Sequence, residues 1–217
     1  MTSQTTREIF TRDFTLAFLA QVTFTSVFYL LIPTLPIYLS KFGSTEIEIG
    51  VLIGIFFLAS VVLRLFVGKA LLKIPEKRFM IIGAILFALT SIALTLTPPF
   101  WPILIVRVFQ GIGFAFFHTS VYTLIANISS ENHMGQSLSY FTLATTISGA
   151  LAPSIGMFLI NQFSFTHFFF VCLGLSLCSL FITSKLGRRQ VAPLQDSFME
   201  DSFLLNRKAL PSSVVSA

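Results

Sequence analysis

The stretch Arg107-Val108-Phe109-Gln110-Gly111-Ile112-Gly113-Phe114-Ala115 places a charged side chain near the start of a long apolar segment. An arginine at the centre of a membrane helix costs about 2.5–3.5 kcal/mol on translocon scales. A chain tolerates this cost when the guanidinium faces a water-filled cavity or a partner group. The stretch therefore predicts a membrane helix that carries a functional arginine.

The rest of the chain has the composition of a membrane protein. Its mean hydropathy is +0.86, only 11% of its 217 residues are charged, and 26 of them are Phe. Asp, Glu, Lys and Arg are absent from residues 14–40 and 132–184. A membrane-spanning helix needs about 20 apolar residues, and the first span lacks the cleavage pattern of a signal peptide. We predict an all-α bundle of six retained spans at residues 14–39, 49–67, 79–97, 103–126, 135–160 and 167–184.

Basic residues outside the spans predict the orientation. With the N-terminus inside, eleven Lys and Arg residues are cytoplasmic and only Lys41 is outside, so the positive-inside rule predicts an N-in, C-in topology. The net charge of +5 then reflects topology and contact with anionic lipid. No soluble basic domain is present, so we expect no nucleic-acid partner. The eleven residues are Arg7, Arg12, Lys69, Lys73, Lys77, Arg78, Lys185, Arg188, Arg189, Arg207 and Lys208.

Cysteine and histidine placement argues against a metal site, a cofactor or an enzyme. Cys172 and Cys178 lie in the sixth span, about 120° apart around one helix, so we expect two buried, unpaired thiols. The three histidines, His118, His133 and His167, lie in three different segments. We predict no resident metal, no cofactor and no catalytic residues.

Three motifs occur in order on spans one, four and five. They are Leu31-Ile32-Pro33-Thr34-Leu35-Pro36-Ile37-Tyr38-Leu39, the Arg107 string, and Gly149-Ala150-Leu151-Ala152-Pro153-Ser154-Ile155-Gly156. Together they resemble the N-terminal half of a major facilitator superfamily transporter, nearest the bacterial twelve-span drug:proton antiporter branch. The resemblance covers nearly the whole chain. It implies a 3+3 inverted repeat and alternating access around a site near the midplane.

The loop between spans two and three matches a cytoplasmic signature of that family in part. Leu72 and Pro75 replace an aspartate and a glycine of the signature, and the family's aspartate helps to latch one conformation. The resemblance implies a gating loop, with Glu76 a candidate substitute for the missing acid, whereas topology alone also explains the basic residues. The matching positions are Gly68, Lys73, Lys77 and Arg78.

Span four presents one polar face at helical spacing. We expect this face to line a central cavity; the alternative for Arg107 is snorkelling to the outer interface. Arg107 can hold a carboxylate deprotonated or bind an anionic group of the substrate, and the resemblance implies a role in proton movement. For His118, a hydrogen-bonded core position competes with a proton-carrying role. The face comprises Arg107, Gln110, Gly111, Phe114 and His118.

Spans one and five carry further stripes. Gln21, Thr25 and Tyr29 are four residues apart and predict either substrate contact or hydrogen bonds between helices. The stripe on span five predicts close approach of another helix with a bend at its proline; the resemblance implies an antiporter-type motif that packs on the other half. It comprises Thr142, Thr146, Gly149, Pro153 and Gly156.

Acidic residues are missing from all six predicted spans. Proton coupling needs a titrating group, usually a carboxylate. Either His118 titrates, or the acid lies elsewhere, or coupling is not to protons. Arg64, one turn before Gly68, is interpreted as snorkelling or anchoring the loop.

The chain divides into a tail at residues 1–13, the bundle at 14–184, a central cytoplasmic loop at 185–206 and the start of a truncated seventh span at 207–217. We predict a secondary transporter of a small organic molecule, exporting by proton antiport in the plasma membrane, the inner membrane of a bacterium. Its partners would be substrate, protons, lipid and the missing C-terminal half or a second half-transporter. The alternatives are uptake of a sugar or metabolite by facilitation or symport, and a transport-incompetent half that acts as an interaction subunit.

Overall fold

The computed structural model describes residues 10–96 and 101–187. This part of the chain folds into six long α-helices and one short 3-10 helix, with no strand among the described residues. The predicted all-α fold of six spans is confirmed. The predicted tail (residues 1–13) lies mostly, and the predicted seventh span wholly, outside the described residues. The helices are α2 (Arg12–Lys41), α3 (Glu46–Ala70), α4 (Glu76–Leu96), α5 (Trp101–Ile128), α6 (Met134–Gln162) and α7 (Phe165–Ser184), with η1 (Glu131–His133) before α6.

All six α-helices are long and apolar enough to cross a membrane. Several extend beyond the predicted spans because polar residues cap them. Thr45 and Glu48 form a reciprocal capping box in which the Thr45 amide donates to Glu48 Oε2 at 2.7 Å, so α3 begins three residues before the predicted span. At α2 the cap is one-way: the Thr11 side chain accepts from the Phe14 amide.

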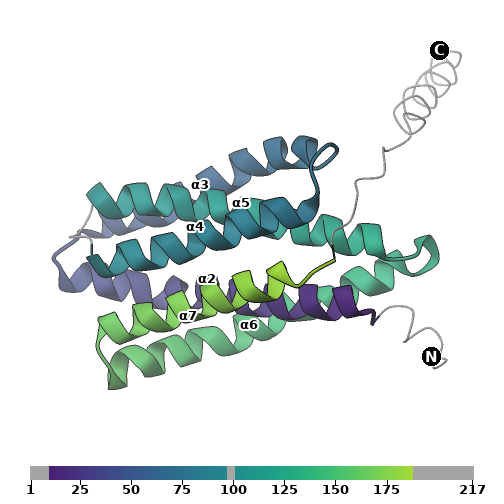
Figure 1. The fold of residues 1–217 in the computed structure, drawn as a ribbon. Helices are drawn as coiled ribbons and strands as arrows, with labels where there is room; N and C mark the ends of the chain where they lie inside the picture. The colour runs from purple at the N-terminus through teal and green to yellow at the C-terminus, as the bar shows by residue number, and fades with distance from the viewer. Residues whose placement is uncertain (1–9, 97–100, 188–217) are drawn as a thin grey trace, which may run out of the picture.

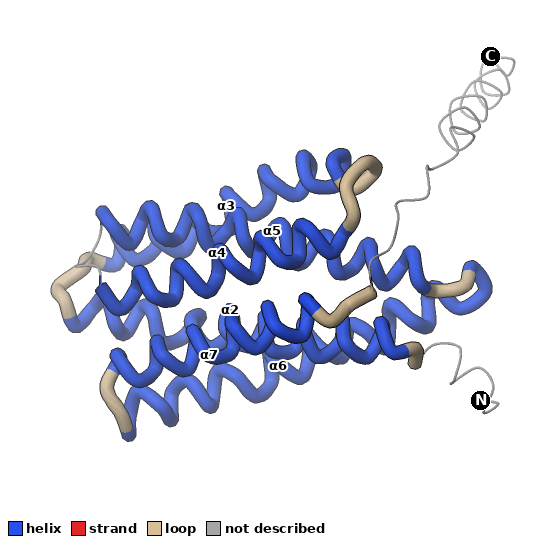
Figure 2. Tube along the Cα trace, viewed as in Figure 1, coloured by secondary structure: helices blue, strands red, loops and turns tan. Residues whose placement is uncertain are grey.

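The helices form two groups of three (Figure 1). In one group α5 packs against α3 and α4, and in the other α2 packs against α6 and α7. The two groups meet where α4 packs against α7, with smaller contacts between α2 and α5. The described connections between successive helices are short loops at the two ends of the bundle (Figure 2).

The centre of the core is aromatic. The Phe24 ring of α2 stacks on Phe117 of α5 at 3.9 Å between ring centroids, and it contacts Phe87 of α4 at 4.3 Å. All three side chains are fully buried. These contacts join the two groups of helices where α2 and α5 cross.

A glycine allows α4 to lie close against α5 in the first group. A Cβ atom on Gly83 of α4 would lie 2.6 Å from the Gly113 carbonyl oxygen and 2.8 Å from the Phe117 amide nitrogen, both on α5. Both atoms belong to the backbone and cannot move aside. Any larger residue at position 83 would therefore separate α4 from α5.

Candidate functional site

Arg107 is buried between α5 and α3, with 5% of its surface exposed. Its Nε donates to the Leu52 carbonyl of α3 at 3.2 Å, and its Nη1 donates to Gln110 Oε1 at 2.7 Å. The guanidinium carbon lies 4.8 Å from the centroid of the Phe56 ring. The side chain is thus held by a backbone carbonyl, an amide and an aromatic face, all supplied by two neighbouring helices.

This environment stabilises a charge that has no carboxylate partner in the described part of the chain. Hydrogen bonds to a carbonyl and an amide, together with a cation–π contact, offset part of the cost of burying a guanidinium. Gln110 Nε2 is buried, and no hydrogen-bond partner for it is present among the described residues. The site can therefore accept one further hydrogen-bond acceptor beside Arg107.

The face predicted on span four splits into two parts. Arg107, Gln110 and Gly111 point toward α3, and a Cβ on Gly111 would collide with the Phe56 carbonyl. Phe114 and His118 lie further along α5, where their rings stack at 5.0 Å. Only His118 of these five is half-exposed in the bundle, whereas the other four are buried.

Arg64 of α3 contacts this second part of the face. This contact was not predicted from the sequence. The Arg64 guanidinium carbon lies 5.6 Å from the centroid of the Phe114 ring. The signal was its register: Arg64 follows the buried residues Leu52, Phe56 and Ser60 of α3 at intervals of four, at the edge of the stripe that packs on α5.

The polar stripe of α2 faces α6. Gln21 Nε2 donates to Thr145 Oγ1 at 3.1 Å, and Thr25 Oγ1 donates to Ser148 Oγ at 3.0 Å. Ser148 in turn donates to the Val22 carbonyl at 3.0 Å. Gln21 and Thr25 are buried and make the interhelical hydrogen bonds that were one of the two predicted roles.

The stripe of α6 also divides. Gly149 packs on the ring of Tyr29, where an added Cβ would lie 3.2 Å from Cζ. Gly156 packs on α2 as well, where an added Cβ would lie 3.1 Å from the Leu30 carbonyl oxygen. Both contacts are with α2 of the same bundle. Thr142 and Thr146 are exposed, and Pro153, inside α6, is half-buried. The close approach expected of these glycines thus occurs inside the six-helix unit.

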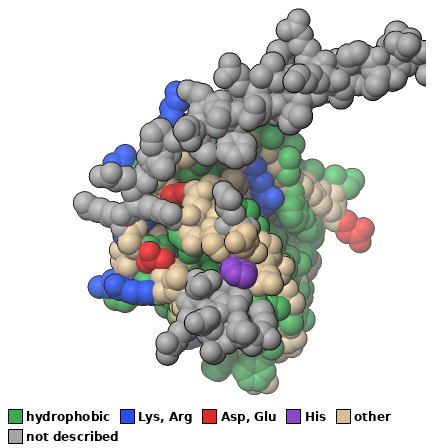
Figure 3. Space-filling view, turned by 90° about the vertical axis from the view of Figure 1, so that its right-hand side faces the viewer, with side chains coloured by type: hydrophobic (Ala, Val, Ile, Leu, Met, Phe, Trp, Pro, Cys, Tyr) green, Lys and Arg blue, Asp and Glu red, His purple; other side chains and the backbone are tan. Residues whose placement is uncertain are grey.

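Charged side chains gather at the end of the bundle that carries the start of α2 and the end of α7 (Figure 3). Glu76 is 7% exposed and accepts a hydrogen bond of 2.5 Å from the Asn127 side chain of α5. Lys77 donates to the carbonyls of Ser184 and Leu186, and the Gly187 amide donates to Asp13.

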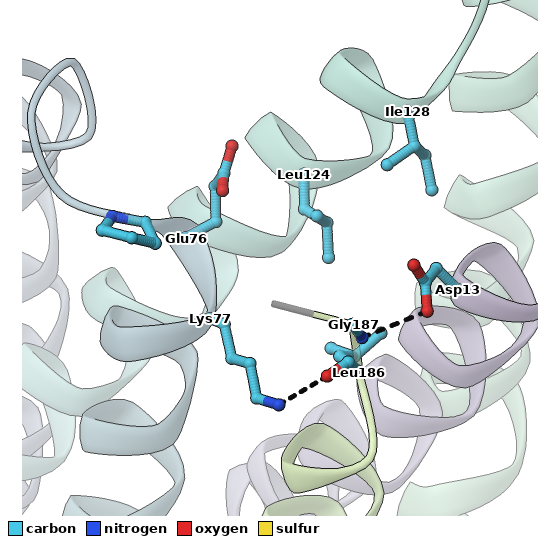
Figure 4. A pocket seen from close by; sticks show the side chains of 8 residues that line it. Asp13, Glu76, Lys77, Leu124, Ile128, Leu186 and Gly187 are labelled. Carbon is cyan, nitrogen blue, oxygen red and sulfur yellow. Dashed lines mark hydrogen bonds between the residues drawn. The ribbon is translucent and has the colours of Figure 1, made fainter. Parts of the chain in front are cut away.

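Asp13, Glu76, Lys77, Leu186 and Gly187 line a cavity of about 220 Å³. Beside it, Lys77 donates to the Leu186 carbonyl and Asp13 accepts from the Gly187 amide, so the chain after α7 is held from two sides (Figure 4). Of the predicted gating residues, only Lys77 takes part. Gly68, Lys73 and Arg78 are exposed. Glu76 connects α4 to α5 through Asn127, and its role as a substitute for the missing latch acid stays a prediction.

Cysteine placement corrects one expectation. Cys172 is buried as predicted, but Cys178 is exposed on the outer surface of α7. Both thiols are free. The described residues contain no group of three His, Cys, Asp or Glu side chains that could hold a metal ion.

Comparison with known protein families identifies the family of the chain. The profile of the Major Facilitator Superfamily matches residues 17–213, which is most of the chain. The chain belongs to the Major Facilitator Superfamily. The resemblance based on the motifs of α2, α5 and α6 is thereby confirmed, and the chain is a multi-pass membrane protein of a family of transporters.

Two relatives illustrate the similarity. An uncharacterised transporter of this superfamily from Methanocaldococcus jannaschii is 28% identical over 151 residues, covering 70% of this chain and 39% of the relative. The quinolone resistance protein NorA of Staphylococcus aureus is 29% identical over 130 residues, covering 60% of this chain and 34% of the relative. The matched part of the chain thus spans less than two fifths of either relative.

Proposed function

We propose that this superfamily chain forms one six-helix unit of a secondary transporter that exports a small organic molecule in exchange for protons. The observation that carries the proposal is the burial of Arg107 between α5 and α3, where Leu52, Gln110 and Phe56 contact its guanidinium. A membrane arginine without a carboxylate among the described residues is a functional position by default. Its charge favours the deprotonated form of an acid brought near it.

Alternating access is supported by the pattern of packing. Exchanging α2, α3 and α4 for α5, α6 and α7 leaves the principal contacts unchanged: α3 on α5 becomes α6 on α2, and α4 on α5 becomes α7 on α2. Such a pattern is expected of a 3+3 inverted repeat, and alternating access would come from rocking this six-helix unit against a second one around a central site. A second six-helix unit would pack along α3 and α6, which bury the smallest shares of their surface.

The proposed orientation places the charged end of the bundle in the cytoplasm of a plasma membrane, with the N-terminus inside. Lys73, Lys77 and Arg78 lie in or just after the α3–α4 turn, and Lys41 lies at the opposite end of α2. This distribution satisfies the positive-inside rule. The bacterial inner membrane remains our proposal for its location.

Export is favoured over uptake by the kinship with the quinolone resistance protein NorA, so a quinolone is the first substrate to try. Facilitated transport without protons is the second candidate, because Asp13, Glu46, Glu48 and Glu76 all lie in the first turns of their helices, and the described residues place no carboxylate in the middle of a span.

Everted vesicles from cells that express the complete native protein test the proposal. A respiration-driven pH gradient is recorded with a fluorescent probe while a quinolone is added. Antiport predicts that the quinolone dissipates the gradient in these vesicles and not in vesicles without the protein. Quinolone accumulation with no dissipation of the gradient favours facilitated transport, and neither signal across a panel of organic solutes contradicts the proposal.

A further inference from the structure

Arg64 places a cation on a surface of α3 that the described residues leave exposed. It is exposed on α3, and its guanidinium rests on the Phe114 ring of α5 at 5.6 Å. No ion pair of Arg64 is present among the described residues. One side of the guanidinium therefore contacts the Phe114 ring, and the other side is accessible to a ligand.

A row of hydrogen-bonding groups continues from Arg64 across α5 to α6. His118 stacks on Phe114 at 5.0 Å and on Tyr122 at 4.8 Å, and the Tyr122 hydroxyl lies 3.4 Å from Thr145 Oγ1. His118, Tyr122 and Thr145 are half-buried, so each side chain keeps part of its surface accessible. The row combines one permanent charge, an imidazole and two hydroxyl groups along an aromatic surface.

The row carries a net positive charge from Arg64. The carboxylates of the described spans lie at helix ends: Asp13 and Glu76 at the charged end, Glu46 and Glu48 at the other. None lies in the row. Guanidinium groups bind carboxylates and phosphates through paired, charge-assisted hydrogen bonds, and an aromatic wall beside them accepts a flat apolar body.

We infer that Arg64, His118 and Tyr122 form a subsite for the oxyanion of an amphipathic aromatic ligand, which is the molecule carried by the proposed transporter. Arg64 binds the oxyanion, and the half-buried imidazole and phenol provide further hydrogen bonds. The claim that this ligand is transported rests on the proposed function. The claim that it binds at this subsite does not. Lipid phosphate is the other source of an oxyanion, since Arg64 is exposed on α3 among the described residues.

Binding to the complete native protein in nanodiscs tests the inference. Three probes share one ring system and differ in charge: 2-naphthoate, 2-naphthylmethanol and 2-naphthylmethylammonium. The variants are Arg64→Gln, which removes the charge, Arg64→Lys, which keeps it, and His118→Phe, which keeps the stack. Lys69→Gln is the matched control, because Lys69 is an exposed cation five residues further along α3.

The subsite predicts that 2-naphthoate binds at least about tenfold more tightly than the alcohol or the ammonium, the effect of one charge-assisted contact. Arg64→Gln should abolish this preference and leave alcohol binding within twofold. His118→Phe should reduce naphthoate affinity several-fold, and Arg64→Lys and Lys69→Gln should retain the preference. Equal binding of all three probes, or no naphthoate binding, would overturn the inference.

Nanodisc composition distinguishes the two sources of the oxyanion. Discs of phosphatidylcholine alone are compared with discs that contain phosphatidylglycerol. The inference predicts less than a threefold change in naphthoate affinity. Displacement of naphthoate by phosphatidylglycerol, dependent on Arg64, would assign the row to a lipid and overturn the ligand claim. Naphthoate preference with no proton exchange in everted vesicles would refute the antiport proposal alone.

Discussion

The Nε of Arg107 donates to the backbone carbonyl of Leu52, 55 positions earlier in the chain, across the interface of α5 and α3. That carbonyl lies within a helix and gains a second donor from the guanidinium. Arg107 therefore has two roles that can be separated: it connects two helices, and it places a permanent charge beside the buried amide of Gln110.

Replacing Arg107 tests the connecting role. Arg107→Met should destabilise the protein by about 1–2 kcal/mol, because hydrogen bonds to a charged group contribute about 1.5–3 kcal/mol in water-soluble proteins and less in membranes. Arg107→Lys should recover part of the loss. Unfolding in increasing mole fractions of SDS measures both. Equal stability of all three proteins would show that the contact with Leu52 contributes nothing.

Glycine substitutions test the close approach of α4 to α5. Gly83→Ala should cost about 1–3 kcal/mol, since the new methyl meets backbone atoms that cannot yield. Gly174→Ala on α7 is the matched control, because a Cβ there has no neighbour within 4 Å. SDS unfolding should separate the two variants. A Gly83→Ala protein as stable as Gly174→Ala would contradict the packing described.

The Thr25–Ser148 hydrogen bond predicts a coupling between α2 and α6. A double-mutant cycle with Thr25→Val and Ser148→Ala should give an interaction energy of about 0.6–1.7 kcal/mol, the range found between membrane helices. A coupling indistinguishable from zero would mean that the two hydroxyls do not pair in the folded protein.

Lys77 should hold the end of α7 in place. Lys77→Met removes the donor to the carbonyls of Ser184 and Leu186, so amide exchange in residues 182–187 should accelerate by about tenfold, equivalent to about 1.4 kcal/mol of local stability. Arg78→Met, the neighbouring exposed cation, is the control and should leave exchange unchanged. Acceleration in both variants would indicate a general charge effect.

Labelling of introduced cysteines tests the proposed orientation. With Cys172 and Cys178 replaced by serine, Ser44→Cys should react with a membrane-impermeant maleimide added to intact cells, and Lys73→Cys should react only after the membrane is permeabilised. These positions lie in turns at opposite ends of the bundle. The reverse pattern would place the charged end outside and refute the N-in topology.

Much of this architecture could be predicted from local sequence. Each helix carries its own apolar stretch, so six spans emerge without tertiary information, and Arg107 meets Gln110 because they are three residues apart on one helix. The helix ends were less predictable, because Thr45 and Glu48 extend α3 into residues that hydropathy alone leaves out.

Contacts between distant helices could not be predicted in this way. The partner of Arg107 is a backbone carbonyl, which has no signature in the sequence, and the glycines Gly149 and Gly156 give no indication of which helix they approach. Arg64 was separated from Phe114 by 50 positions, and only its register relative to Ser60 hinted at a shared interface. The pairing of Glu76 with Asn127 likewise depends on how α4 lies against α5.

The most direct test of the proposed role of Arg107 is substrate-driven proton flux in liposomes that contain the complete native protein, as wild type and as Arg107→Lys and Arg107→Ala. An internal pH indicator follows an imposed gradient after substrate is added. We predict that substrate dissipates the gradient with the wild type, that flux falls at least about tenfold with Arg107→Ala while substrate still binds, and that Arg107→Lys retains part of the flux. Equal flux in wild type and Arg107→Ala, or no substrate-driven flux with the wild type, would contradict proton coupling through Arg107.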